Sequence, residues 1–139
     1  MAFHPYLFFG GNCREAFTRY HEIFGGDLVL LDMNEAPPDA RSPGIDPNLI
    51  IHAALKIGDA LVMASDDPIA DPFGPVQGMQ VNYSTTDAAD AQRVFDALAD
   101  GGQITGPFGP TFFSPAFGMC VDRFGTPWMV SADPPADGS

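Results

Sequence analysis

The first candidates for binding chemistry are neutral polar side chains at every second position of segment 79–85: Gln80, Asn82 and Ser84. The positions between them hold apolar or aromatic residues. A period of two is typical of a β-strand with one polar and one apolar face. A helix would cover the apolar face, so we expect the polar face to contact a small ligand. The alternative is a plain solvated sheet face.

Of the three histidines, His52 is the candidate for contact with a ligand. If residues 58–59 form a two-residue turn, His52 lies opposite Ser65 and shares a face with Lys56. It is then either a ligand contact or a structural histidine that is hydrogen-bonded near Asp66. Met129, late in the chain, is an adaptable apolar side chain that we expect to line the ligand site.

The other residues with reactive side chains favour structural interpretations. His4 is expected to be packed or solvated, and His21 to lie on a helix surface. Cys13 falls in the first turn of a predicted helix, where the helix dipole lowers a thiol pKa. A small buried side chain is the favoured interpretation of Cys13. The sequence contains no Ser-His-Asp set, no phosphate-binding loop and no nucleotide fingerprint.

The elements that position these residues follow from periodicity and turn signals. The first half predicts strand 3–9, helix 12–24, and strands 27–33, 49–57 and 60–65. The second half predicts strand 79–85, helix 87–99, strand-like pieces at 103–107, 111–114 and 118–121, and strand 127–132. Proline-rich loops are expected at 35–48 and 66–76, and a disordered tail at 134–139.

Helix boundaries repeat between the halves. Asn12, with Glu15 in capping-box position, and Asp87 are the predicted N-caps, and paired glycines end both helices. A shift of 75 residues superimposes caps, core positions and terminators, and a shift of 67 superimposes Gly58 on Gly125. The chain is therefore expected to be a single α+β domain of 139 residues. It would consist of two βαβββ modules, one at about 1–66 and the other at about 77–133.

The amino-acid composition excludes some classes of binding partner and predicts the cellular compartment. The formal net charge is −12, from 18 acidic and 6 basic residues, so nucleic acid and anionic membrane surfaces are not expected to bind. No apolar run is long enough to span a membrane, and no signal peptide is evident. The two cysteines, Cys13 and Cys120, are expected to be reduced thiols of a cytoplasmic protein; a disulfide between them is the alternative.

A set of motifs resembles the PhnB-like proteins of the vicinal oxygen chelate superfamily. That superfamily includes glyoxalase I, the extradiol dioxygenases, and the fosfomycin and bleomycin resistance proteins. The resemblance covers nearly the whole chain, through segments 5–9, 11–17, 24–26, 51–53, 58–59, 63–66, 117–119, 122–125 and 127–129. It implies two βαβββ modules whose mixed sheets curl into an open cup with the helices outside. Nothing in the sequence resembles a methyl-donor site, although some members of the group carry a methyltransferase name.

In the metal-using relatives, the resemblance implies four ligands, from the first and last strands of both modules. Counted through the repeat, the corresponding positions here are Pro5, Val62, Gln80 and Met129. Proline and valine have no donor atom, a thioether is a poor ligand for a hard cation, and one amide is weak by itself, whereas the relatives use sets of His, Glu or Gln. No metal and no other cofactor is therefore expected; one divalent metal ion is the alternative.

The resulting functional hypothesis is a protein that binds a small polar or amphiphilic molecule in the cup, as a sequestering protein or a metal-free enzyme. The expected ligand-binding residues are Gln80, Asn82, Ser84, Met129 and His52. The alternative is a metal-dependent lyase, isomerase or thiol transferase of the glyoxalase or fosfomycin-resistance kind. Sheets with exposed edges must be covered, and relatives commonly dimerise, so a homodimer is expected. The sequence does not determine the ligand, or whether a reaction is catalysed.

Overall fold

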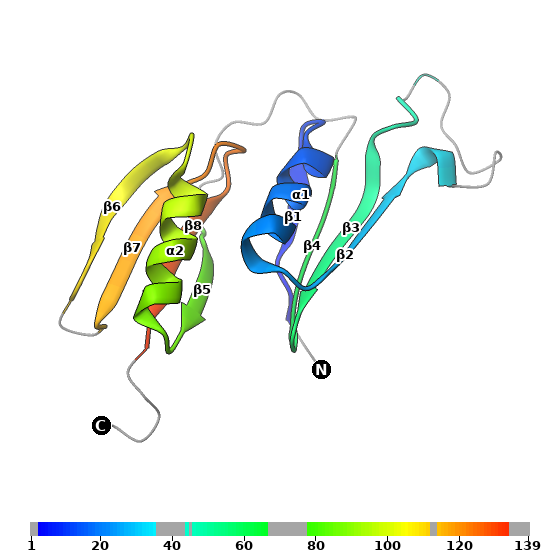
Figure 1. Cartoon of the computed structure of the whole chain (residues 1–139). Coiled ribbons are helices and arrows are strands. Elements are labelled where there is room, and N and C mark those ends of the chain that lie inside the picture. The colour runs from blue at the N-terminus through cyan, green and yellow to red at the C-terminus, as the bar shows by residue number, and fades with distance from the viewer. Residues whose placement is uncertain (1–2, 36–43, 45, 67–77, 112–113, 134–139) are drawn as a thin grey trace. The chain divides into compact units, whose positions relative to one another are not determined.

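The computed structural model of the chain describes residues 3–35, 44, 46–66, 78–111 and 114–133. The chain forms two compact units, residues 1–73 and 74–139. Each unit has one α-helix and one four-stranded sheet (Figure 1). Most of the two predicted proline-rich loops, and the whole predicted tail, lie outside the described residues.

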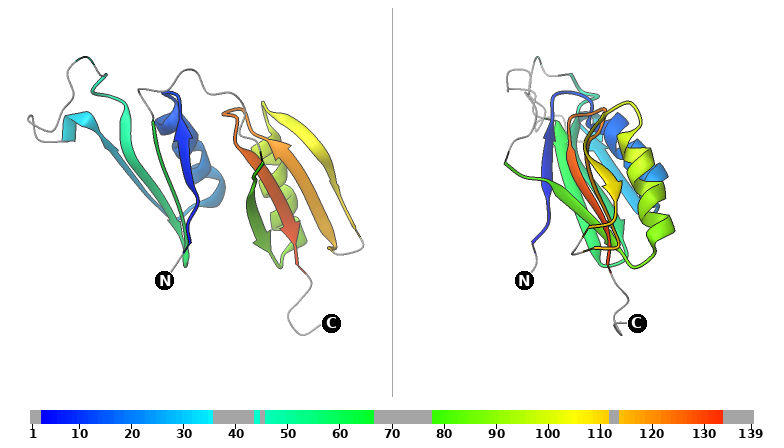
Figure 2. Two further views of the ribbon diagram at one scale, coloured as in Figure 1. Left: turned by 180° about the vertical axis from the view of Figure 1, so that it is seen from behind. Right: turned by 90° about the vertical axis from the view of Figure 1, so that its left-hand side faces the viewer.

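The first unit is a βαβββ module with a mixed sheet. Its strands follow the order β1-β4-β3-β2, with β1 parallel to β4 and the other pairs antiparallel. The elements are β1 (Tyr6–Phe9), α1 (Cys13–Phe24), β2 (Asp27–Asp32), the 3₁₀ turn η1 (Met33–Glu35), β3 (Ile50–Ile57) and β4 (Ala60–Asp66). Helix α1 lies along one face of this sheet (Figure 2).

The core of the first unit lies between α1 and that face. Ala16, Phe17 and Tyr20 of the helix are buried, and Phe17 meets Phe9 edge to face at 6.2 Å between ring centroids. The alternation of Leu7 and Phe9 with exposed neighbours therefore assigns the two faces of β1.

Helix α1 begins differently from the prediction. Asn12 makes no side-chain capping hydrogen bond. Instead, the backbone N–H groups of Gly11 and Cys13 donate to Asp66 Oδ1, each at 3.0 Å, and that of Ile50 donates to Asp66 Oδ2 at 2.9 Å. The predicted capping box of Asn12 is wrong, because a carboxylate from the end of β4 satisfies the first turn of the helix.

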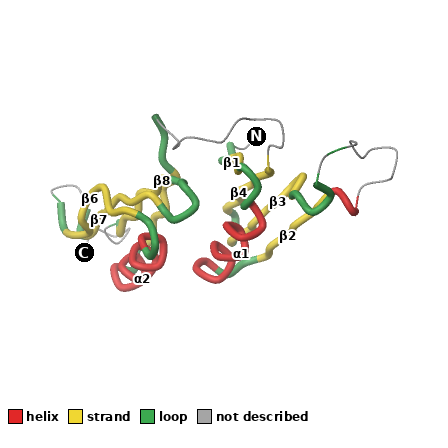
Figure 3. The backbone as a smooth tube through the Cα atoms, turned by 90° about the horizontal axis from the view of Figure 1, so that it is seen from above, coloured by secondary structure: helices red, strands yellow, loops and turns green. Residues whose placement is uncertain are grey.

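The second unit repeats the topology. Its strands follow the order β5-β8-β7-β6, and β5 is parallel to β8. The elements are β5 (Val81–Thr85), α2 (Ala88–Ala99), β6 (Gln103–Gly109), β7 (Ala116–Val121) and β8 (Pro127–Ala132). Helix α2 covers one face of this sheet, as the tube drawing also shows (Figure 3). Asp87 caps α2 as predicted, by accepting a hydrogen bond from the Ala89 N–H at 2.9 Å.

The core of the second unit lies between α2 and its sheet. Val94, Phe95 and Leu98 of the helix are buried, and Trp128 of β8 is only 3% exposed. The Phe95 ring lies against Gly118, where an added Cβ would come within 2.7 Å of it. Trp128 is therefore a core aromatic residue at the helix–sheet contact.

The predicted fold class is confirmed: an α+β protein of two βαβββ modules with mixed sheets. Several boundaries differ. Strand β1 starts at Tyr6 instead of residue 3, β5 starts at Val81 and excludes Gln80, and β6 runs through Gly109. The middle of the predicted piece 111–114 lies outside the described residues. Cys13 and Cys120 are both free thiols, and both are buried, as predicted for Cys13. Among the described residues, neither helix has the length and apolarity that crossing a membrane requires.

Candidate functional site

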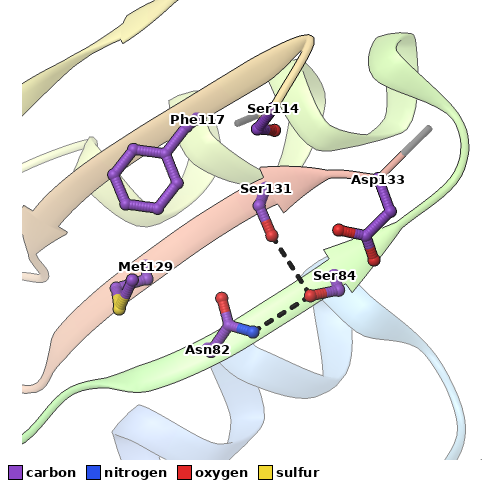
Figure 4. A pocket seen from close by; sticks show the side chains of 7 residues that line it. All are labelled: Asn82, Ser84, Ser114, Phe117, Met129, Ser131 and Asp133. Carbon is purple, nitrogen blue, oxygen red and sulfur yellow. Dashed lines mark hydrogen bonds between the residues drawn. The ribbon is translucent and has the colours of Figure 1, made fainter. Parts of the chain in front are cut away.

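A hollow of about 410 Å³ opens on the face of the second sheet that α2 leaves uncovered. Two neighbouring strands, β5 and β8, supply most of its lining, and residues at the end of β8 and at the start of β7 complete it. The lining residues are Asn82, Ser84, Ser114, Phe117, Met129, Ser131 and Asp133 (Figure 4). The site lies entirely within the second unit.

Strand register brings these side chains together. Asn82 pairs with Met129, and Ser84 with Ser131, in the parallel ladder between β5 and β8. Phe117 of β7 lies opposite Ser131 in the antiparallel ladder. Paired residues share a face of a sheet, so all five point to the side opposite α2.

The other face of β5 belongs to the core. The Tyr83 hydroxyl donates to Asp90 Oδ2 of α2 at 2.6 Å. Burial, followed by this hydrogen bond and the Asp90 charge, raises the pKa of Tyr83 to about 12. In return, the hydrogen bond from Tyr83 and the one from Arg93 lower the pKa of Asp90. The predicted two faces of this strand are thus the faces that the structure shows.

A chain of hydrogen bonds runs across the polar part of the hollow. Asn82 Nδ2 donates to Ser84 Oγ at 3.0 Å, and Ser84 Oγ lies 3.1 Å from Ser131 Oγ, where either hydroxyl can donate (Figure 4). One of the two hydroxyl hydrogens is used between the serines, and the other is left for a ligand. The Asn82 carbonyl oxygen also has no hydrogen-bond partner among the described residues.

Asp133 and Ser114 close the polar end. The Asp133 N–H donates to the Thr85 carbonyl at 2.7 Å, which fixes the backbone, and the side chain is exposed. Ser114 is 6% exposed, and its Oγ lies 2.7 Å from the carbonyl oxygens of both Ala116 and Ala132. Ser114 thereby ties the start of β7 to the end of β8, whereas the Asp133 carboxylate remains available to a ligand.

The remaining lining is apolar. Phe117 and Met129 are both half-buried and lie on the β7 and β8 side of the polar chain. An aromatic ring and an adaptable thioether offer contact area to an apolar group without requiring one shape. The hollow is therefore amphiphilic, with hydrogen-bonding groups along β5 and an apolar surface beside them.

Three of the five sequence-predicted site residues come together in this hollow: Asn82, Ser84 and Met129. Gln80 is exposed just before β5 and is not among the lining residues. The sequence reasoning missed Ser131, Phe117 and Asp133. The alternation of Met129 with Trp128 and Val130 was a signal for Ser131, whereas Phe117 required the register between β7 and β8.

His52 lies in the other unit, on the face of the first sheet opposite α1. Its ring centroid is 6.3 Å from that of Tyr6, and the β3–β4 register places it opposite Ser65. Asp66 accepts its three hydrogen bonds from backbone N–H groups. His52 occupies the place in the first sheet that Phe117 occupies in the second.

Two of the four repeat-derived metal positions, Pro5 and Val62, are one residue out of register. Val62 pairs with the buried Leu55 and so faces α1, not the open face. A shift of 66 residues, instead of 67, superimposes the open-face residues of β4 on those of β8. With this shift Met63 corresponds to Met129. On β1 and β5, Tyr6 and Asn82 are the residues that pair with these two methionines.

These corrected positions also do not fit a divalent metal ion. A phenol, an amide and two thioethers form a weak donor set for a hard cation. Within the part of the chain that the structure describes, no three His, Cys, Asp or Glu side chains gather in a way that could hold a metal ion.

The cysteines lie apart from the hollow. Cys13 is fully buried, and burial, followed by the nearby Asp66 charge, raises its pKa to about 12. Burial and the Asp122 charge raise the pKa of Cys120 to about 11. The interpretation of Cys13 as a small buried side chain is confirmed.

Comparison with known proteins gives consistent matches over the full length. The family described as 3-demethylubiquinone-9 3-methyltransferase matches residues 1–131. Protein YjdN from Escherichia coli (strain K12) is 30% identical over 142 residues, which cover 94% of this chain and 95% of YjdN.

Three solved structures share the fold. Protein PA1353 from Pseudomonas aeruginosa has a TM-score of 0.87 and 41% identity, covering 96% of this chain and 98% of that one. A PhnB protein from Bacillus cereus has a TM-score of 0.78 and 24% identity, covering 95% and 99%. A glyoxalase/bleomycin resistance protein/dioxygenase family enzyme from Burkholderia phytofirmans has a TM-score of 0.62 and 12% identity, covering 93% and 95%. The chain thus has the glyoxalase/bleomycin resistance fold.

Proposed function

Since the chain belongs to the PhnB-like family described as 3-demethylubiquinone-9 3-methyltransferase, we propose that it binds a small polar or amphiphilic molecule on the open face of its second sheet. The observation that carries this proposal is the hollow lined by the hydrogen-bonded chain Asn82–Ser84–Ser131 beside Phe117 and Met129. Concave sites with a few polar groups on an apolar lining are typical of ligand binding.

The proposed role is binding, as a sequestering protein or as an enzyme that uses no metal. The family description names a methyl transfer, but this sequence has no glycine-rich loop after a strand of the kind that holds a methyl donor. We propose a cytoplasmic location, which two free, buried thiols support because such thiols suit a reducing compartment.

Two of the expected ligand-binding residues, Gln80 and His52, do not line the hollow, and we propose that they contact a ligand outside it. Gln80 lies two residues before Asn82, so a ligand longer than the hollow would reach it. His52, beside Tyr6, takes the corresponding role on the open face of the first sheet.

We expect no functional divalent metal, because the donors on the open faces do not suit one. The rival is a metal-dependent lyase, isomerase or thiol transferase. Elemental analysis of untagged protein after dialysis separates them. Stoichiometric zinc, nickel, iron or manganese that is lost in variants of the open-face residues would favour the rival.

Asn82→Ala tests the binding role. Removing a neutral hydrogen bond costs about 0.5–1.5 kcal/mol, so the affinity for a compound found by thermal-shift screening should fall about two- to tenfold. The melting temperature should hardly change, since Asn82 is exposed and outside the core.

Tyr83→Phe is the matched control in the same strand. It removes the hydroxyl that donates to Asp90, so it should lower stability by about 1 kcal/mol and leave binding unchanged. Calorimetric titration measures the affinity and urea denaturation the stability. The proposal fails if Asn82→Ala and Ser84→Ala both bind every screened compound as tightly as the parent chain.

A further inference from the structure

We propose that the hollow selects amphiphiles that carry a positive charge, such as an ammonium group on a short arm attached to an apolar ring. This inference rests on the proposed function, because it names the chemical class of the ligand for the same hollow. Three independent features of the second unit carry it: one unpaired carboxylate, an excess of acceptors, and an apolar surface beside them.

The only charged side chain among the lining residues is Asp133. It is exposed at the rim, and its carboxylate has no ion-pair or hydrogen-bond partner among the described residues. Its backbone is fixed by the hydrogen bond to Thr85 at 2.7 Å, so the charge is held beside Ser84 (Figure 4). A cation bound across the serines would therefore lie within reach of a carboxylate.

No cation is available in the second unit to balance an anionic ligand. From Gly74 to Ser139 the sequence holds seven acidic residues and two basic ones, Arg93 and Arg123. Arg93 is paired with Asp90 of α2 at 2.8 Å, and Arg123 lies 3.7 Å from Asp100. An anion would enter a negative field with no counter-charge.

The neutral groups also favour a donor-rich ligand. The free Asn82 carbonyl oxygen and the serine lone pairs accept hydrogen bonds, as the Asp133 carboxylate does. An ammonium group has three N–H donors and no acceptor, which complements this set. Phe117 and Met129, beside the polar chain, offer contact area to the apolar part of the same molecule.

Three probes with one phenyl ring and similar arms isolate the charge: 2-phenylethylammonium, 2-phenylethanol and 3-phenylpropanoate. Titrations into ¹⁵N-labelled full-length chain follow the backbone amides of Asn82, Ser84 and Ser131. At low ionic strength the affinity for the cation should be at least about five times the affinity for the anion. Added salt should lower this ratio, because it screens the charge of Asp133.

Asp133→Asn should bring the ratio of cation to anion affinity close to one. Asp96→Asn is the matched control, because it removes the same charge from the exposed side of α2, on the opposite face of the sheet. That variant should keep the ratio of the parent chain.

Equal or tighter binding of the anion at these amides overturns the charge class while leaving the proposed function intact. The charge class is also overturned if Asp96→Asn loses as much of the preference for the cation over the anion as Asp133→Asn does. If none of the probes and none of the screened compounds shifts these amides, the proposed function itself fails, and this inference falls with it.

Discussion

Buried carboxylates and thiols show, at the scale of single residues, how the surroundings decide the role of a reactive group. Asp122 is 5% exposed, and it accepts hydrogen bonds from the N–H groups of Phe124 and Thr126 and from Trp128 Nε1, each at 2.9 Å. A carboxylate with so many donors organises the turn between β7 and β8. The motif of residues 122–128 is therefore structural, and its Trp128 lies on the core side of the sheet.

The two thiols are expected to be unreactive in the folded protein. The pKa values of Cys13 and Cys120 are raised from 9.0 to about 12 and about 11, so at neutral pH both are protonated as well as buried. Since the thiolate is the nucleophile, a disulfide reagent should modify neither at about pH 8, and both once the chain is unfolded in guanidinium. Rapid modification of either thiol in the native chain would contradict this.

The same shifts determine a pH dependence of stability. Above the ordinary thiol pKa the unfolded chain loses these protons before the folded chain does, so the unfolded state is favoured. The free energy of unfolding should therefore hold below about pH 9 and fall as the pH rises towards 12. Tyr83, with a pKa of about 12, contributes in the same direction. Cys13→Ala should lessen the decline, measured by urea denaturation at successive pH values.

At the scale of elements, a carboxylate accepts hydrogen bonds from backbone N–H groups at the start of each helix, but the two carboxylates come from different parts of the chain. Asp87 directly precedes α2 and caps it locally. Asp66 reaches α1 from the end of β4, and it also accepts from Ile50 of β3. In the first unit the cap therefore ties a helix to two strands, so its loss should affect the whole module.

The two caps should differ in their contribution to stability. Asp87→Ala removes a local cap and should cost about 1 kcal/mol. Asp66→Ala leaves backbone donors unsatisfied, of which those of Cys13 and Ile50 are buried, at about 1–3 kcal/mol each, so it should cost about 3 kcal/mol or more. Urea denaturation followed by circular dichroism compares them. Similar losses for the two variants would mean that Asp66 adds nothing beyond a local cap.

At the scale of the whole molecule, the duplicated modules have diverged in what their open faces offer. The second sheet presents the hollow with its polar chain. The first presents large apolar side chains that are more than a third exposed: Tyr6, Phe8, Val29 and Leu31. Clusters of exposed apolar residues on a sheet face are typical of surfaces that another surface covers.

We expect the chain to form a homodimer. Apolar side chains on the first sheet, and the edge strands of both sheets, are surfaces that soluble proteins cover. Light scattering at tens of micromolar protein should give twice the chain mass of 14.8 kDa. Phe8→Lys should shift the mass towards the monomer, whereas Lys substitution of the helix residue Gln92 should not. A monomer mass for the parent chain would contradict the expectation.

The sequence by itself determined the modules and the local signals within them. Alternation along segment 79–85 assigned Asn82 and Ser84 to one face and Tyr83 to the other, because strand periodicity is a local property. The cap at Asp87 and the helix-ending glycines could likewise be predicted, because both depend on neighbouring backbone groups.

Only the tertiary structure decided what depends on pairing between distant segments. Ser131 and Phe117 join the hollow through ladders to β5 and β8, and Asp66 caps a helix more than fifty residues away in sequence. The repeat placed Val62 instead of Met63 at the open face, because Met63 follows Gly58 by five residues whereas Met129 follows the matched Gly125 by four. One added residue in a turn exchanges the two faces of the following strand, and strand pairing, not sequence spacing, reveals it.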